Sequence, residues 1–154
     1  MKFLPLFTIL ATPLLFSNCR EAREKMTVVK QEAAAAGDVT FAKNTFASLA
    51  KGDSSVSTKI DWPVFTSLGE NLGASYVALS SDVEKQKLTS SFITQFSVSF
   101  RESGGSVDAY SNWRVVSHDS QKTEVAADSS GGALTVIVSE RNGVEKISSI
   151  NVVK

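Results

Sequence analysis

The chain has 154 residues, and its 16 Lys and Arg residues balance its 16 Asp and Glu residues. Because no cluster of basic residues marks a phosphate-binding face, we expect no nucleic-acid partner. The single cysteine excludes an intramolecular disulfide and any metal site built from several cysteines. An apolar fraction of 42% is ordinary for a small globular domain held together by packing alone.

Residues 1–19 have the organisation of a secretory signal peptide. Lys2 precedes an uncharged, mostly apolar run that ends at Phe16, which is the length of a signal-peptide h-region. A membrane-spanning helix needs about 20 apolar residues, so this run is too short to be one. We therefore expect an exported protein of the periplasm or the cell surface.

The signal segment ends in Phe16-Ser17-Asn18-Cys19, which resembles the lipobox of bacterial lipoproteins. In that motif the cysteine becomes the lipidated first residue of the mature chain. The usual motif has a branched aliphatic residue in place of Phe16 and Gly or Ala in place of Asn18. The alternative is cleavage by the ordinary signal peptidase, with no lipid. We expect lipidation of Cys19 and attachment to a membrane. The outer membrane is favoured, because Arg20 stands where Asp signals inner-membrane retention in some bacteria.

The next two segments precede the predicted sheet. Residues 20–37 are rich in charged residues and alanine, and they are predicted to form a spacer or an extension of the first helix. Residues 38–154 are predicted to form a single α+β domain. Its first helix is expected to begin at an Asp38 N-cap and to end at Lys51, before Gly52.

Two further helices are predicted. Asp61 before Trp62-Pro63 indicates the start of a second helix, whose apolar stripe runs to Tyr76. Ser81 and Glu84 have the spacing of a capping box at the start of a third helix. The third helix carries aromatic residues four apart on one face: Phe92, Phe96 and Phe100.

From residue 107 onward the apolar pattern alternates, which indicates strands. The predicted strands cover residues 107–116, 122–127, 134–140 and 144–153. Asn142-Gly143 between the last two is typical of a type I′ hairpin turn. The fold class is therefore α+β, with three N-terminal helices packed on a four-stranded antiparallel sheet.

With this order of elements, the chain resembles the nuclear-transport-factor-2-like superfamily from Val39 to Val152. The resemblance rests on Phe41-Ala42-Lys43-Asn44-Thr45-Phe46, on Lys51-Gly52-Asp53 and on the closing hairpin at residues 141–152. It implies a curved, cone-like sheet around helices, an interior that commonly holds an apolar ligand, and a homodimer formed through the open sheet face.

A second resemblance is to the periplasmic phospholipid-shuttle proteins of the Mla pathway. It rests on Leu72-Gly73-Ala74-Ser75-Tyr76, on Ser80-Ser81 and on Phe92-Ile93-Thr94-Gln95-Phe96. It implies transport of a lipid between membranes.

Catalytic patterns are sparse. His118 is the only histidine, which excludes a two-histidine metal site. Its neighbour Asp119 lies in the same predicted turn, where adjacent side chains usually point apart. No nucleophile elbow, phosphate loop or zinc-binding HExxH pattern is present. We predict no catalytic residue, no metal and no cofactor, so that an enzyme is the less favoured interpretation.

Enzymes of the superfamily often place a carboxylate and a tyrosine inside the cone. Asp61, Asp108, Tyr76 and Tyr110 are of those residue types, but they match no family motif residue by residue. A buried tyrosine that packs its ring and hydrogen-bonds its hydroxyl group is the alternative interpretation.

An apolar binding site is the favoured functional hypothesis. Six side chains are candidates for the lining of a pocket, although helical spacing fits core packing equally well: Phe65, Tyr76, Phe92, Phe96, Phe100 and Trp113. We expect a non-catalytic binding or accessory domain that recognises an apolar small molecule or another envelope protein. The alternatives are lipid transport of the Mla type and an isomerase- or hydrolase-like enzyme.

Overall fold

The computed structural model describes the backbone of residues 17–153 and the side chains of residues 34–152. The chain divides into two units, residues 1–33 and residues 34–154. The first helix begins in the first unit, whereas the sheet and the later helices belong to the second unit. None of the helices within residues 17–153 combines the length and the apolar character that crossing a membrane requires.

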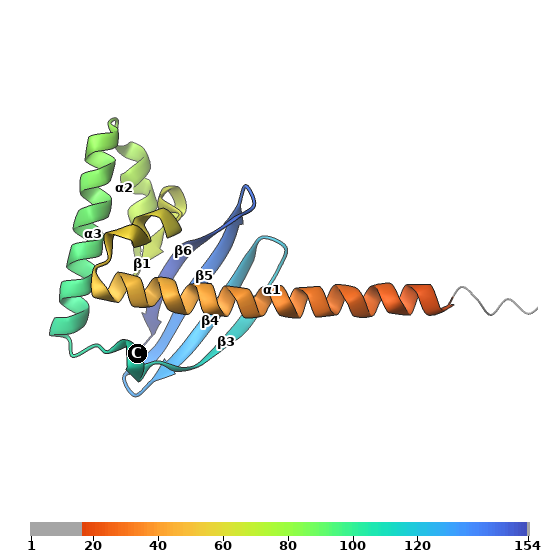
Figure 1. Cartoon of the computed structure of the whole chain (residues 1–154). Coiled ribbons are helices and arrows are strands. Elements are labelled where there is room, and N and C mark those ends of the chain that lie inside the picture. Colours follow the sequence, from red (N-terminus) through yellow and green to blue (C-terminus); the bar gives the residue numbers. More distant parts are fainter. Residues whose placement is uncertain (1–16, 154) are drawn as a thin grey trace, which may run out of the picture. The chain divides into compact units, whose positions relative to one another are not determined.

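Residues 17–153 form three α-helices, three short 3₁₀ segments and six strands (Figure 1). The helical elements are α1 (Ser17–Lys51), η1 (Ser54–Lys59), η2 (Trp62–Val64), α2 (Leu72–Ala78), α3 (Asp82–Glu102) and η3 (Val107–Ala109). The strands are β1 (Thr66–Ser67), β2 (Glu70–Asn71), β3 (Ser111–His118), β4 (Lys122–Ser129), β5 (Gly132–Arg141) and β6 (Val144–Val153).

The six strands form one mixed sheet in the order β2-β1-β6-β5-β4-β3. The long strands β3 to β6 are an antiparallel meander, whereas β1 pairs in parallel with β6. The α+β class is therefore confirmed, but the predicted sheet of four antiparallel strands is wrong. The two additional strands have two residues each, which is too short for an alternating apolar pattern to indicate them.

The first helix ends at Lys51 as predicted, but its predicted start and the predicted second helix are wrong, so the predicted arrangement of three N-terminal helices is not observed. Asp38 lies inside α1, which already includes Ser17. Trp62-Pro63 begins only a 3₁₀ turn, and the chain then enters the β1–β2 hairpin before the seven-residue α2. Local sequence favoured a helix there, but Thr66 pairs with Ser149 of β6, a partner 83 residues away that no local pattern contains.

The third helix and the last hairpin are confirmed. Ser81 and Glu84 form the predicted capping box, in which each caps the other's backbone N–H. Asn142 and Gly143 have φ angles of 55° and 74°, as a type I′ turn requires. The first long strand begins later than predicted, because residues 107–109 form η3.

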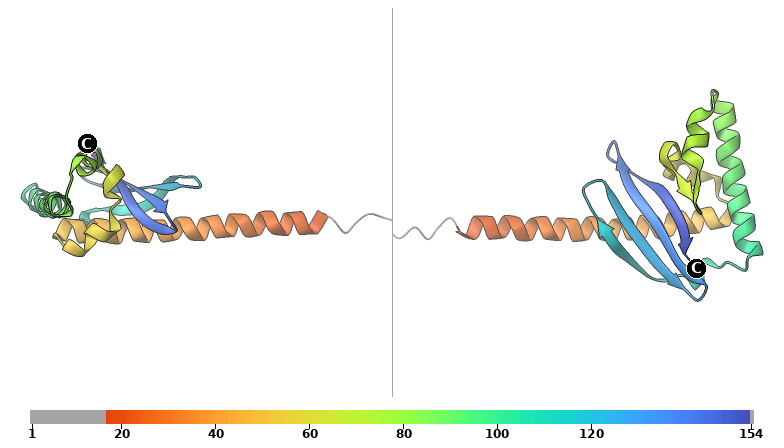
Figure 2. Two further views of the ribbon diagram at one scale, coloured as in Figure 1. Left: turned by 90° about the horizontal axis from the view of Figure 1, so that it is seen from above. Right: turned by 180° about the vertical axis from the view of Figure 1, so that it is seen from behind.

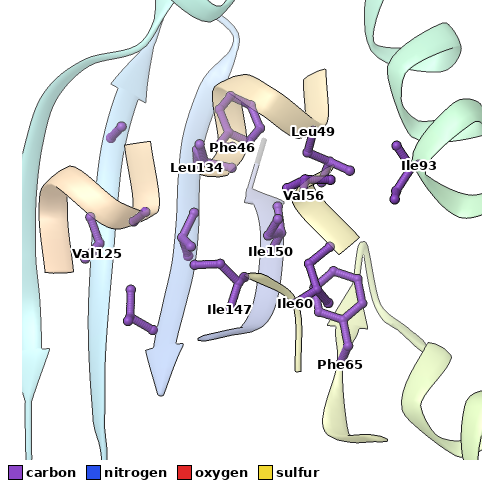
Figure 3. Packing of buried hydrophobic residues seen from close by; sticks show 14 of the residues in the cluster. Phe46, Leu49, Val56, Ile60, Phe65, Ile93, Val125, Leu134, Ile147 and Ile150 are labelled. Atoms are coloured by element: carbon purple, nitrogen blue, oxygen red, sulfur yellow. The ribbon is translucent and has the colours of Figure 1, made fainter. Parts of the chain in front are cut away.

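The core lies between one face of the sheet and the C-terminal part of α1 (Figure 3). Phe46 and Leu49 of α1 are buried there against alternate residues of the long strands. The principal sheet residues in this layer are Val125, Ala127, Leu134, Val136, Val138, Ile147 and Ile150. Figure 2 shows α3 beside the C-terminal end of α1 rather than over the middle of the sheet.

Candidate functional site

Nine aromatic side chains from α1, α2, α3, β3 and the connecting segments form one contiguous group, which we call the aromatic cluster. Neighbouring ring centroids lie between 5.2 and 6.4 Å apart, mostly edge to face. Its members are Phe46, Trp62, Phe65, Tyr76, Phe92, Phe96, Phe100, Tyr110 and Trp113. All six predicted pocket residues belong to it, and Trp113 faces the helices rather than the opposite side of the sheet.

Phe46 is the centre of the aromatic cluster. It is only 1% exposed, and its ring contacts those of Phe96, Phe100, Tyr110 and Trp113. These contacts come from α3 and from the residues around the start of β3, and no local pattern around Phe46 indicates them.

Burial along α3 does not follow residue size, because two small polar side chains are more buried than three phenylalanine rings. The buried side chains are Thr89, Ile93 and Ser97, whereas Phe92, Phe96 and Phe100 on the adjacent stripe remain partly exposed. Large apolar residues normally occupy the most buried positions of a helix.

Close packing at the C-terminal end of α1 explains this arrangement. A Cβ atom on Gly52 would lie 2.8 Å from the Ser97 Oγ atom, so only small residues fit between the two segments. The phenyl rings consequently lie at the rim of the contact.

A second group of side chains joins α1 to the β3–β4 hairpin, and we call it the Asp38–Thr123–His118 relay. The Thr123 hydroxyl donates a short hydrogen bond to the Asp38 Oδ2 atom, and the His118 Nδ1 atom lies 2.6 Å from the same hydroxyl oxygen. Thr123 is 1% exposed and Asp38 is 9% exposed, whereas His118 is exposed. The strand pairing of His118 with Thr123 places both side chains on the face of the sheet that meets α1.

The relay borders a polar hollow of about 110 Å³. Its lining also includes Lys122, Glu140 and Glu145. Glu145 lies at the exposed edge of the hollow, where partial desolvation, together with the nearby Asp38 and Glu140 carboxylates, raises its pKa. The lining therefore holds carboxylates that repel one another.

Asp119 also lines this hollow, but its carboxylate is already occupied. Its Oδ1 atom accepts hydrogen bonds from the backbone N–H groups of Gln121 and Lys122 at 2.8 and 2.9 Å. These bonds hold the pKa of the Asp119 carboxyl below its ordinary value. Asp119 therefore closes the turn and does not pair with His118. This agrees with the expectation that adjacent side chains in a turn point apart.

A larger hollow of about 510 Å³ lies on the opposite face of the sheet, where β1, β5 and β6 meet. One wall contains the ion pair between Arg141 and Asp61, whose Nε and Oδ2 atoms are 3.1 Å apart. The Asp61 side chain is only 7% exposed. Asp61, which the sequence suggested as the start of a helix and as a candidate catalytic carboxylate, is thus paired with Arg141.

The remaining sequence candidates do not converge on one site. Tyr76 stacks on Trp62 and Tyr110 packs on Phe46, so both tyrosines belong to the aromatic cluster. Asp108 is exposed in η3. Cys19 lies in the first turn of α1, and the apolar signal segment before Ser17 falls outside the described residues.

The described part of the chain contains no group of three or more His, Cys, Asp and Glu side chains arranged to hold a metal ion. Neither of these two hollows is lined by a residue of the aromatic cluster. Comparisons of the chain with models of known protein families, with curated proteins and with solved structures gave no match. The two family resemblances, like the apolar pocket, therefore stay predictions.

Sequence reasoning missed the Asp38–Thr123–His118 relay. A turn at His118 implies that this residue pairs with a residue near the start of the next strand. That pairing was the available indication that His118 lies beside Thr123. No local signal could have placed Asp38 beside Thr123, because 85 residues separate them.

Proposed function

We propose that this protein is a membrane-tethered, non-catalytic binding domain of the bacterial cell envelope, and that its ligand is a small apolar molecule such as an acyl chain. The supporting observation is the reversed burial on α3, where three phenylalanine rings stay partly exposed while the smaller Thr89 and Ser97 are buried beside Ile93. A protein that needed these rings only for stability would gain more by burying them fully.

The energetic case is simple. Covering apolar surface contributes about 25 cal/mol for each Å², so shielding about 100 Å² of ring surface contributes about 2.5 kcal/mol. Phe92, Phe96 and Phe100 lie one helical turn apart, which makes a continuous apolar row along α3. An extended apolar chain fits such a row better than a compact molecule does.

The proposed tether is the lipidated Cys19. The chain is helical from Ser17 onward, so residues 20–33 would separate the lipid from the domain as a helical segment rather than as a flexible linker. Permanent tethering favours a ligand-binding or accessory role over that of a diffusing lipid shuttle.

The first test concerns the tether. The wild-type chain expressed in a bacterial host should carry the mass of a diacylglycerol thioether at Cys19 and fractionate with membranes. The variant Cys19→Ser should lack that added mass. An unmodified wild-type chain in the soluble periplasmic fraction would contradict the tether and leave cleavage by the ordinary signal peptidase.

The second test concerns the ligand. Residues 20–154, exported behind a cleavable signal and purified without detergent, should show in native mass spectrometry a bound species of several hundred daltons. Phe96→Ala should reduce its occupancy, whereas Val98→Ala, an exposed position on the same helix, should leave it unchanged. Circular dichroism would verify that both variants are folded. A ligand-free mass for the parent protein would contradict the apolar ligand and favour a protein partner.

A further inference from the structure

We propose that the Asp38–Thr123–His118 relay and the hollow beside it form a second binding site, which takes a small primary amine with the His118 Nε2 atom as an acceptor. The site is separate from the aromatic cluster and does not depend on its ligand. It rests on the hydrogen-bond geometry of three side chains and on an adjacent cavity of about 110 Å³.

Counting donors fixes the tautomer of His118. The Thr123 hydroxyl has one proton, and it donates that proton to the Asp38 carboxylate. The 2.6 Å contact between His118 Nδ1 and the same hydroxyl oxygen then requires a proton on Nδ1. The neutral ring consequently has its lone pair on Nε2, which is the nitrogen left for a ligand.

A structural role for His118 would not need this orientation. Thr123 alone gives the Asp38 carboxylate, which is 9% exposed, a hydrogen-bond donor in the core. His118 is exposed and contributes little to packing. Its ring is nevertheless held at one nitrogen by the buried Thr123, which is itself bonded to Asp38. Proteins orient a histidine that acts through its other nitrogen in this way.

The lining of the hollow indicates the class of ligand. Glu140 and Glu145 offer carboxylate oxygens beside His118, and Lys122 is the basic residue in the lining. An ammonium group could donate hydrogen bonds to Nε2 and to a carboxylate at once. The cavity has room for several water molecules and hence for a ligand of a few heavy atoms.

The repulsion at Glu145 supports the same choice. Although Glu145 is exposed, partial desolvation and the Asp38 and Glu140 carboxylates raise its pKa. A bound cation would offset that repulsion, whereas a bound anion would increase it.

The first experiment tests the tautomer in the full chain. Because His118 is the only histidine, its two ring nitrogens can be assigned in ¹⁵N spectra without ambiguity. When the ring is neutral, the expected spectrum has a protonated Nδ1 and an unprotonated Nε2. Thr123→Ser should keep this pattern, and Thr123→Val should shift the ring toward the Nε2–H form that histidine prefers in water. A wild-type ring in the Nε2–H form would overturn the relay.

The second experiment titrates the same sample with ethylamine, and in parallel with acetate at equal ionic strength. The expected result is a saturable shift of the His118 ring signals with ethylamine and none with acetate. Glu145→Gln should weaken ethylamine binding at least fivefold without changing the tautomer. An unsaturable response to ethylamine, or equal responses to ethylamine and acetate, would overturn the amine site.

Discussion

At the scale of single residues, the carboxyl groups of this protein differ in pKa according to the hydrogen-bond donors around them. Asp119 and Asp53 accept backbone N–H groups in exposed turns, and these bonds lower the pKa of each. Arg114 likewise lowers the pKa of Asp128. Among residues 34–152 Glu145 has no such donor, and partial desolvation together with the carboxylates near it raises its pKa.

The Asp119 turn gives a prediction about pH dependence. Because the pKa of Asp119 is lower in the folded than in the unfolded state, its contribution to stability is present above the ordinary value of 3.8 and is lost as the pH falls through the folded pKa. Asp119→Ala should therefore lower the urea midpoint at pH 7 more than at pH 3. Asp119→Asn, which keeps an oxygen acceptor, should retain much of the stability at pH 7. An equal effect of Asp119→Ala at both pH values would contradict this account.

Single residues also show which parts of the candidate sites could be predicted from the sequence. The six predicted pocket residues lie in one cluster because helical and strand periodicity determines which side chains face the core. His118 was recognised as the one titratable imidazole, but its relay partners were not. A hydrogen bond from His118 to Thr123 and on to Asp38 depends on the docking of α1 against β4, which no spacing in the sequence encodes.

At the scale of elements, the β1–β2 and β5–β6 hairpins make the same kind of turn with different residues. Asn142-Gly143 and Leu68-Gly69 both have positive φ angles at both central residues, as a type I′ turn requires. Asparagine adopts that conformation readily, whereas leucine at φ 52° is strained by its Cβ atom. The Leu68 side chain is 60% exposed, so packing does little to offset the strain.

Replacing this leucine should therefore stabilise the protein. We expect Leu68→Asn to raise the free energy of unfolding by about 1 kcal/mol, because it removes the left-handed strain while removing little buried apolar surface. The reverse change at the matched position, Asn142→Leu, should lower it by a similar amount. Urea unfolding at 25 °C measures both. A destabilised Leu68→Asn variant would show that the exposed leucine makes a contact worth more than its strain.

The same hairpin explains why the second helix was mispredicted. The residues from Trp62 to Tyr76 have helical apolar spacing, and a proline stands where a helix can begin. The edge of β6 nevertheless offers backbone partners to Thr66 and Ser67. Satisfying those hydrogen bonds outweighs a local preference for helix of a few tenths of a kcal/mol per residue.

At the scale of the whole molecule, one ion pair connects segments far apart in sequence. Asp61, between η1 and η2, is 7% exposed and pairs with Arg141 at the end of β5. The Asp61 backbone N–H also donates to the Ile147 carbonyl of β6. This contact joins the connecting segment to the sheet.

Removing the arginine should be costly because it leaves a buried carboxylate without its cation. We expect Arg141→Met to lower the free energy of unfolding by about 3 kcal/mol, and Asp61→Asn in the same chain to restore part of the loss. The control is Arg114→Met, which breaks a pair with Asp128 in which both side chains are about half exposed and should cost at most about 1 kcal/mol. Equal losses for the two single variants would show that Asp61 is solvated in spite of its burial.

The sequence by itself determined the features that neighbouring residues decide. These are the α+β class, the capped third helix, the four long strands and the Asn142-Gly143 turn, since capping, turn conformation and apolar alternation act over a few residues. Only the tertiary structure decided the β1–β6 pairing, the reversed burial on α3 and the Asp38–Thr123–His118 relay. Each of these joins segments far apart in the chain, and their contacts follow from how the helices dock on the sheet rather than from any local preference.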